Sequence, residues 1–297
     1  MAGTAVRASR NNTGVTLQYQ AVSSRISLVA GVRAEDNASF GTVGVPRVSV
    51  SGLLRRGAGP LGDTKLKFNA GLGIKEPTIL QSFSPNAFFQ GNPNLLPERA
   101  RAIDAGVEQR LAGDRAKVEV VWFDNRYRNQ IATQTTNFTT FAAQYFNIGL
   151  TTARGLELAA ETAPVPAVHV RGGYTFTDSE IVDSTNAFSP VFAKGQWAFR
   201  RPRHAGFVQV GWSYKTVAID LAGTFVGRRT DSDFFALGTP VNSDEPYAIW
   251  TVGGHYRPVP RVDLFLRVEN LTDKDYMEPL GYQAWRRTAH AGLRIGF

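Results

Sequence analysis

The feature that most constrains this chain is a two-residue alternation of apolar and polar side chains that recurs along most of its length. In the closing stretch "TAHAGLRIGF", the apolar positions are Ala289, Ala291, Leu293, Ile295 and Phe297, and the residues between them are polar or very small. Successive side chains of a strand point to opposite faces, so this stretch is a strand with two unlike faces. The apolar face covers a core in a soluble sheet, but it meets lipid in a membrane barrel, where the polar face lines a wet lumen.

The same alternation predicts about thirteen strands in total. In "KLKFNAGLGIK", for example, Leu66, Phe68 and Leu72 alternate with Lys65 and Lys67. The expected strands are long enough for the roughly 9–11 tilted residues with which a β-strand crosses a bilayer. No helical periodicity of comparable strength appears, and no stretch approaches the roughly 18 uninterrupted apolar residues of a transmembrane helix. The pattern therefore predicts an all-β, antiparallel fold.

The connections between the expected strands alternate between short and long. We expect short turns around 23–24, 57–62, 112–114, 163–166, 215 and 257–260, and long loops around 35–44, 76–100, 134–144, 178–203, 229–246 and 272–283. An outer-membrane barrel has this pattern, with tight periplasmic turns and longer extracellular loops. A β-sandwich or a propeller has no reason for it. The last strand descends from a long loop, so Phe297 is expected at the periplasmic rim.

Aromatic residues on the apolar faces agree with this orientation. The expected periplasmic set is Tyr19, Trp212, Tyr214, Tyr256 and Phe297, and the expected extracellular set is Tyr174, Phe176 and Phe225. Membrane barrels carry aromatic girdles at both interfaces. Aromatic residues are common in any strand, but their joint agreement with the loop pattern favours lipid on the apolar face.

The composition excludes several classes of function. The formal net charge is +8, and 26 of the 33 basic residues are arginine, but they are spread along the chain. A nucleic-acid-binding protein gathers them in a stripe, so no nucleic-acid partner is expected. The chain has no cysteine, which removes disulfides and thiolate metal sites.

No motif indicates catalysis, a cofactor or a bound metal. The nucleophile elbow, the P-loop and the dinucleotide fingerprint do not occur. The four histidines have no ligand-like spacing, and three of them fall on polar strand faces, where ordinary lumen residues are expected; they are His169, His204, His255 and His290. We therefore expect a protein that is not an enzyme.

Three stretches, in their order along the chain, resemble one known family. "KEPTILQSF" followed by "GNPNLLPERARAIDAGVEQ" is similar to the mid-barrel segment of TonB-dependent outer-membrane receptors, where Asn-Pro-x-Leu-x-Pro-Glu leads into a strand. "YFNIGLTTARGLELAAE" resembles their Asn-x-Gly…Arg-Gly-x-Glu segment, and "RVENLTDKDYMEPLGYQAWRRTAHAGLRIGF" resembles their terminal signature. Arg286-Arg287 stands where Gly-Arg is common in the family. The resemblance covers roughly residues 65–297.

This resemblance implies a receptor of the bacterial cell outer membrane that takes up a ferric siderophore, cobalamin or a similar nutrient. Such transporters have 22-stranded barrels with a plugged lumen, whereas about thirteen strands are expected here and nothing resembles a plug domain. Residues 1–297 are therefore expected to form the C-terminal portion of such a barrel. The implied partners are outer-membrane lipid and lipopolysaccharide, the TonB energy-coupling complex, the barrel-assembly machinery and the ferric chelate or similar ligand.

The N-terminal stretch "MAGTAVRASRNNTGVTLQYQ" has no positive segment followed by an apolar one, so no signal peptide is recognised. Together with the strand number, this predicts a fragment that does not transport by itself. A truncated gene or a misassigned start would each produce one. Two alternatives stay open: a passive, porin-like small channel, and a soluble β protein with an interaction role.

The candidate ligand-binding residues lie in the expected long loops, because rigid scaffolds usually carry binding residues there. They are Phe88, Phe89, Gln90, Arg228, Arg229, Phe234 and Phe235. Paired aromatics and arginines suit a bulky anionic chelate through stacking and charge-assisted hydrogen bonds, although loop packing or contact with lipopolysaccharide phosphates would explain them as well. The resemblance implies that Phe297 is part of a barrel-assembly signal. Asn270, Asp273, Asp275 and Tyr276 are expected to form a turn.

Overall fold

The computed structural model of the chain describes residues 7–86, 88–137, 139–184, 187, 189–231 and 242–296. Its main element is a thirteen-stranded antiparallel sheet whose strands pair in the order in which they follow along the chain, with β11 and β12 left out between β10 and β13. The strands of this sheet are β1 (Asn12–Val22), β2 (Ile26–Asn37), β3 (Gly41–Arg55), β4 (Leu61–Lys75), β5 (Glu98–Leu111), β6 (Ala116–Asn137), β7 (Ala142–Val165), β8 (Val168–Asp183), β9 (His204–Tyr214), β10 (Val217–Val226), β13 (Tyr247–Val259), β14 (Val262–Glu269) and β15 (Thr288–Ile295). The expected all-β, partial-barrel fold is confirmed.

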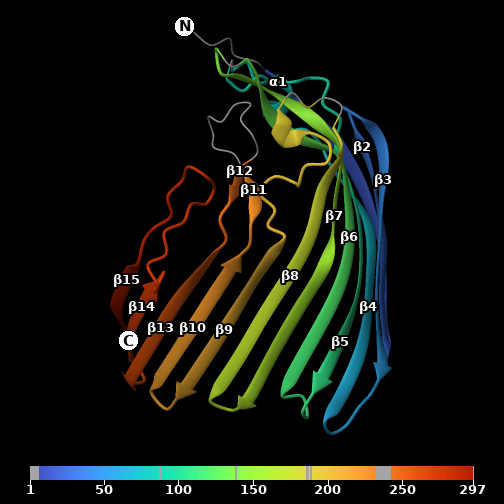
Figure 1. Ribbon diagram of the computed structural model, residues 1–297. Coiled ribbons are helices and arrows are strands. Elements are labelled where there is room, and N and C mark those ends of the chain that lie inside the picture. The colour runs from blue at the N-terminus through green and yellow to red at the C-terminus, as the bar shows by residue number, and fades with distance from the viewer. Residues whose placement is uncertain are drawn as a thin grey trace.

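Figure 1 shows the sheet curved into a trough, with tight turns at its lower rim and larger connections at its upper rim. β1 and β15 form the two ends of the sheet and do not pair with each other. The upper connections contain a short helix α1 (Ile79–Phe83), a 3-10 turn η1 (Pro190–Phe192) and a small ribbon of β11 (Arg229–Asp231) and β12 (Asn242–Asp244). No helix in the described part of the chain is long and apolar enough to span a membrane.

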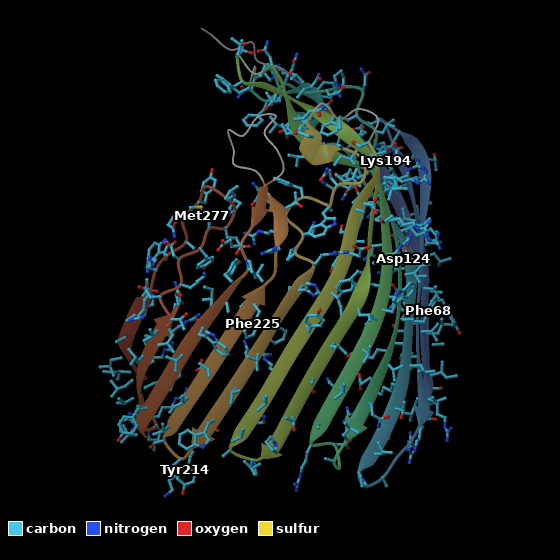
Figure 2. All side chains as sticks on the ribbon, viewed as in Figure 1. Phe68, Asp124, Lys194, Tyr214, Phe225 and Met277 are labelled. Atoms are coloured by element: carbon cyan, nitrogen blue, oxygen red, sulfur yellow. The ribbon has the colours of Figure 1, made fainter. Side chains whose placement is uncertain are left out.

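The alternation of the sequence separates the two faces of the sheet. Figure 2 shows Phe68 on the convex side of the wall, and the strand register places Ala105 and Trp122 in the same row. Phe68 and Trp122 stay 42% and 45% exposed although the sheet is complete around them. Lys67 lies on the opposite, concave face, where it forms ion pairs with Glu108 and Glu119. The convex face is therefore the apolar one, as a lipid-facing surface requires.

The prediction of a long loop is wrong at two of the six places. Around 35–44, β2 continues to Asn37 and β3 begins at Gly41, and around 134–144, β6 continues to Asn137 and β7 begins at Ala142. In both places polar residues lengthen the two strands of a hairpin instead of forming a loop. A hairpin that projects into water pairs its backbone without needing an apolar face, so its sequence lacks the alternation that marks a spanning strand. The other long connections and the short turns lie close to where they are expected, although β8 continues to Asp183 and β7 continues to Val165.

The buried apolar residues of the described chain gather at the upper end of the structure. Phe146, Ile148 and Ile181 form one cluster, against which Ala132 and Phe192 pack. Phe146 and Ile148 come from the extended part of β7, and Ile181 comes from the end of β8. This upper core fixes the large loops relative to the sheet, and it therefore positions whatever those loops bind.

The described aromatic residues agree with two girdles on the convex face. Near the short turns, Tyr19, Tyr214 and Tyr256 are exposed and Trp212 stacks on Tyr214 with ring centroids 6.4 Å apart. Toward the upper rim, Tyr174 is exposed, Phe176 packs on His204 at 5.4 Å, and Phe225 meets Trp250 edge-on at 5.5 Å. Phe297 lies outside the described residues. This arrangement supports the predicted orientation of the sheet.

Candidate ligand-binding site

The upper half of the concave face holds a cavity of about 790 Å³. Strands β4 to β8 form its wall, and the loop 184–203 contributes to its upper margin. The residues that distinguish this margin are Tyr127, Phe192, Phe199 and Arg201. An aromatic margin above a polar wall is typical of a site for a large, partly polar ligand.

The loop 184–203 is held in place by the upper core. The Ser189 side chain caps η1 by accepting a hydrogen bond from the Val191 amide, and Val191 is buried. Phe192 meets Phe146 of β7 edge-on, with ring centroids 5.3 Å apart. Phe199 in turn lies 6.1 Å from Phe192, so the strand extension fixes the position of both loop aromatics.

Arg201 differs from the arginines beside it. Arg200 donates to Asp231 at 2.8 Å and Arg203 donates to Asp178 at 2.8 Å, so each of these guanidinium groups has a carboxylate. Arg201 is exposed at the cavity margin, and no side-chain hydrogen bond or ion pair to another described residue joins it. The cavity thus has a guanidinium group that can bind an anionic ligand.

The lower wall of the cavity carries charges that compensate one another. Lys67 Nζ lies 2.7 Å from Glu108 and 2.8 Å from Glu119, while Lys65 lies 3.7 Å from Glu108. Asn69 donates a hydrogen bond to Asp104 from the neighbouring strand. These side chains are already paired, so we assign them to the lumen wall and not to ligand contact.

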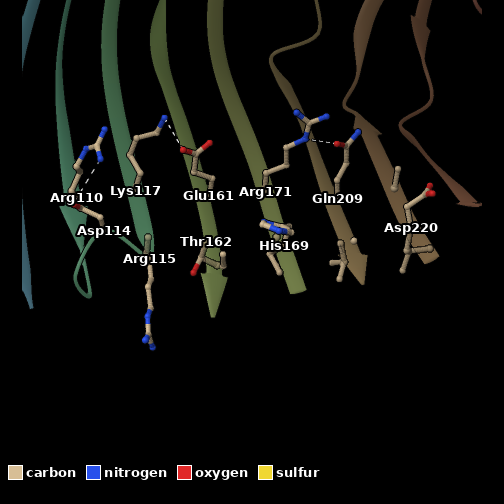
Figure 3. Close-up of a pocket in the computed structure, with 17 residues that line it drawn as sticks. Arg110, Asp114, Arg115, Lys117, Glu161, Thr162, His169, Arg171, Gln209 and Asp220 are labelled. Carbon is tan, nitrogen blue, oxygen red and sulfur yellow. Dashed lines mark hydrogen bonds and ion pairs between the residues drawn. The ribbon is translucent and has the colours of Figure 1, made fainter. Parts of the chain in front are cut away.

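A second hollow of about 650 Å³ lies on the sheet toward the short turns, and Figure 3 shows its side chains. Lys117 pairs with Glu161 at 2.9 Å, and Arg171 donates to Gln209. His169 lies between these rungs and the lower rim (Figure 3). The polar rungs therefore continue along the concave face almost to its lower end, as a wet lumen requires.

Of the predicted loop residues, Phe88, Phe89 and Gln90 lie near the top of β7. The Gln90 amide donates to the Ala143 carbonyl at 2.8 Å, and the Tyr145 amide donates to the Gln90 carbonyl at 3.4 Å. Phe88 and Phe89 are 59% and 38% exposed. The backbone of Gln90 thus anchors this loop, while both aromatic rings remain accessible.

Arg228 and Arg229 have different environments. Arg228 is exposed. Arg229 is 4% exposed, and its guanidinium donates to Glu278 at 3.0 Å and to the Met277 carbonyl at 3.2 Å. Arg229 therefore joins two upper loops. Phe234 and Phe235 lie outside the described residues, and the ligand-binding role of all seven predicted residues stays a prediction.

The predicted turn at 270–276 is confirmed. The Asn270 side chain accepts from the Lys274 amide and donates to the Lys274 carbonyl, both at 2.8 Å. Arg286 stands where glycine is common in the family, and it donates to Asp273 at 2.9 Å, so the turn accommodates this arginine through an ion pair. The Arg286 guanidinium and the Arg287 amide lower the pKa of Asp273 to about 2. Among the described residues, no group of three or more histidines, cysteines or carboxylates could hold a metal ion.

The family model described as TonB dependent receptor-like, beta-barrel, matches residues 3–271. The chain belongs to this family. The proteins of the family are transporters, not enzymes, and their barrels lie in the bacterial outer membrane. The predicted membership of this family is thereby confirmed.

Solved structures of siderophore receptors and of a copper transporter share the fold. A variant of the ferric enterobactin receptor (PfeA) of Pseudomonas aeruginosa is 17% identical, with a TM-score of 0.73, 96% of this chain covered and 45% of that chain. The siderophore receptor PirA of Acinetobacter baumannii is 16% identical, with a TM-score of 0.75 and coverages of 96% and 46%. The copper transporter OprC is 15% identical, with a TM-score of 0.76 and coverages of 96% and 48%. This TonB-dependent receptor chain therefore spans about half the length of these solved structures.

Proposed function

We propose that the protein serves in the bacterial outer membrane in the uptake of a ferric siderophore or a chelate of similar size. The observation that carries this proposal is the upper cavity, where Phe199 and Tyr127 offer aromatic faces and Arg201 offers an uncompensated cation. Rings stack on planar ligand groups, and a guanidinium binds carboxylate or catecholate oxygens through charge-assisted hydrogen bonds. Cobalamin is the second bulky cargo that such a site could hold.

The proposal includes energy coupling by the TonB complex and insertion by the barrel-assembly machinery. The unpaired outer edges of β1 and β15 would be costly in lipid, where every backbone group needs a partner. We therefore propose that further strands complete the barrel and that a plug contacts the charged concave face. The family match does not favour a passive porin.

The test is ligand binding by the full gene product, purified from outer membranes in detergent. Titration with a ferric catecholate, a ferric hydroxamate and cobalamin should give saturable binding of one of them. The double variant Phe199→Ala/Arg201→Gln should weaken that binding about tenfold or more, because it removes a stacking surface and a charge-assisted hydrogen bond.

The matched control is Arg171→Gln, which removes a lumen-side charge in the lower hollow, away from the upper cavity. It should bind as the unsubstituted protein does. Equal affinity of all three proteins would remove the upper cavity from the site. A folded protein that binds none of the three ligands, but binds Cu²⁺, would replace the chelate by a free metal ion as the cargo.

The loop prediction is tested separately. Arg228→Ala and Phe88→Ala/Phe89→Ala should weaken binding if these exposed side chains contact the ligand, and unchanged affinity would exclude them. Arg229→Ala is a poor test of ligand contact, because Arg229 holds two loops together through its hydrogen bonds to Glu278 and Met277.

Deletion of Phe297 should lower the amount of protein inserted in the outer membrane without changing the affinity of the protein that is inserted.

A further inference from the structure

Five exposed arginines lie on the convex face of the sheet, at the upper margin of its apolar surface. They are Arg99 and Arg101 of β5, Arg126 and Arg128 of β6, and Arg154 of β7. The register places Arg99 directly opposite Arg128 and Arg101 directly opposite Arg126. We call these five residues the outer arginine patch.

The outer arginine patch is poorly compensated within the protein. Asp124 lies 3.3 Å from Arg126 and 2.8 Å from Arg154, and it is the one carboxylate paired with the patch in the described structure. No ion pair to a described residue involves Arg99, Arg101 or Arg128. Like charges directly opposite each other on neighbouring strands destabilise a sheet. Two such pairs in succession therefore point to an anion that binds from outside.

An apolar groove adjoins the outer arginine patch. The pairing of β3 with β4 ends at Arg47 and Gly71. Above that point a groove of about 300 Å³ opens, and its lining includes Leu72, Ile74 and Val45 together with four of the arginines. A ligand that fills this site should therefore carry negative charge and an apolar chain side by side.

The height of the outer arginine patch on the sheet further narrows the choice of ligand. Three apolar residues lie just below the arginines on the same convex face: Ile103 follows Arg101 on β5, Trp122 precedes the arginines of β6, and Leu156 follows Arg154 on β7. Trp122 precedes Arg126 by four positions, which is about 13 Å along a strand. The lipid-facing band of a membrane barrel is about 25 Å tall, so a position about 13 Å above the mid-height row of Phe68 and Trp122 lies at the level of lipid headgroups on the extracellular side.

We propose that the outer arginine patch binds the phosphate groups of the phosphorylated glycolipid of the outer leaflet, lipid A, with one of its acyl chains in the groove. Planar guanidinium groups bind phosphate bidentately and are less strongly hydrated than lysine ammonium groups. An acidic protein segment would leave the groove without an occupant, and free phosphate would too. The inference rests on the proposed location in the outer membrane.

Lipid binding by the purified gene product in detergent tests this inference. Bisphosphorylated lipid A is titrated, and bound lipid is counted by native mass spectrometry. Arg101→Gln/Arg126→Gln should weaken binding about tenfold or more, because it removes two groups that donate charge-assisted hydrogen bonds. The control is Arg25→Gln/Arg56→Gln, which removes the same charge at the short-turn end of the sheet and should bind lipid A as the unsubstituted protein does.

The outcomes separate the sources of phosphate. Lipid A without phosphates should bind weakly to every protein, and inorganic phosphate should compete poorly because it cannot use the groove. Equal affinity of the patch variant and the control would overturn the inference, and so would full competition by inorganic phosphate. Both variants should bind the ferric chelate normally, so a failure of the lipid site and a failure of the proposed uptake function give different results.

Discussion

The lower, membrane-spanning part of the sheet and the upper part, formed by the extended ends of β6 to β8 and the large loops, bury apolar side chains in different ways. In the upper part Ile181 is 1% exposed and Phe146 is 5% exposed, inside a protein core. In the lower part Leu266 and Leu293 are 54% and 55% exposed on the convex face. The same residue types thus face protein in one region and the surroundings in the other.

This difference shows how one chain meets two solvents. The upper part projects into water and must cover its apolar residues with other residues, as any soluble domain does. The spanning part needs no second layer, because lipid tails cover its convex face. Its concave face has polar rungs such as Lys117 with Glu161. The following experiments test whether each region depends on the solvent assigned to it.

The largest effect is expected for Ile181→Ala in the upper core. Truncation of a fully buried aliphatic residue leaves a cavity and lowers the free energy of unfolding by about 2–5 kcal/mol. The matched variant is Ile219→Ala on the convex face, where lipid can fill the space and the cavity contribution disappears. Urea titration of the protein in micelles measures both. If Ile219→Ala lowered the free energy of unfolding as much as Ile181→Ala, the claim that only the upper part buries apolar residues in a protein core would be contradicted.

Phe68→Arg introduces a charge into the convex face. A lipid-facing arginine near the bilayer midplane costs about 2–4 kcal/mol of stability. Ser49→Arg is the control, because the register places Ser49 on the concave face one row away, opposite Asn69. Membrane insertion and unfolding free energy should fall for Phe68→Arg and stay nearly unchanged for Ser49→Arg. The opposite order would mean that the faces are assigned wrongly.

A smaller effect is expected for Asp231→Ala, which acts only in the upper part. Asp231 is fully buried, accepts from Arg200 at 2.8 Å and accepts from the Leu280 amide at 3.0 Å. A hydrogen bond to a charged group contributes about 1.5–3 kcal/mol, but half-exposed Arg200 is hydrated again when its partner is removed, so the loss stays near the lower end of that range. Amide hydrogen exchange should therefore rise in the loops 184–203 and 270–287 but not in the spanning strands. Asp178→Ala, which breaks an exposed pair, is the control and should change exchange little.

The smallest effect is a dependence on acidic pH in the loop 270–287. The Arg286 guanidinium and the Arg287 amide lower the pKa of Asp273 from 3.8 to about 2. A lowered pKa in the folded state contributes stability that is present above about pH 4 and is lost as the pH falls through about 2. Carboxyl NMR titration of Asp273 should show this pKa, and Arg286→Gln should raise it. A titration midpoint near 3.8 in the unsubstituted protein would show that Arg286 and Asp273 do not interact in the folded loop.

Much of the spanning sheet could be predicted from the sequence because a strand with two unlike environments records both of them. Leu66, Phe68 and Leu72 alternate with Lys65 and Lys67, and the structure places the two sets on opposite faces. The strand number followed from the same pattern. The hairpin at 134–144 could not be found in this way, since both faces of its strands meet water or loops and the alternation disappears.

The candidate site was less accessible to sequence reasoning. Arg229 and the neighbouring aromatics were chosen because an expected long loop carries paired arginines and aromatics, but the fold buries Arg229 against Glu278. Phe199 and Arg201 were missed, although "QWAFRRPR" contains both. The three arginines of this stretch look alike in the sequence, but in the structure Arg200 and Arg203 have carboxylate partners. Only the folded loop shows which arginine remains available. The outer arginine patch was missed for a related reason, since its members come from three strands.

The measurement that tests the central claim most directly is a scan of single cysteines along β4, in outer membranes that contain the full gene product. Residues 1–297 contain no cysteine, and any cysteine elsewhere in the gene product is first replaced by serine, so each substituted position reports alone. Spin labels at positions 65 to 72 are compared for collision with oxygen, which concentrates in lipid, and with a water-soluble nickel complex. We predict oxygen access at Leu66→Cys, Phe68→Cys and Leu72→Cys, and nickel access at Lys65→Cys and Lys67→Cys. Nickel access at all five positions would contradict the assignment of the convex face to lipid.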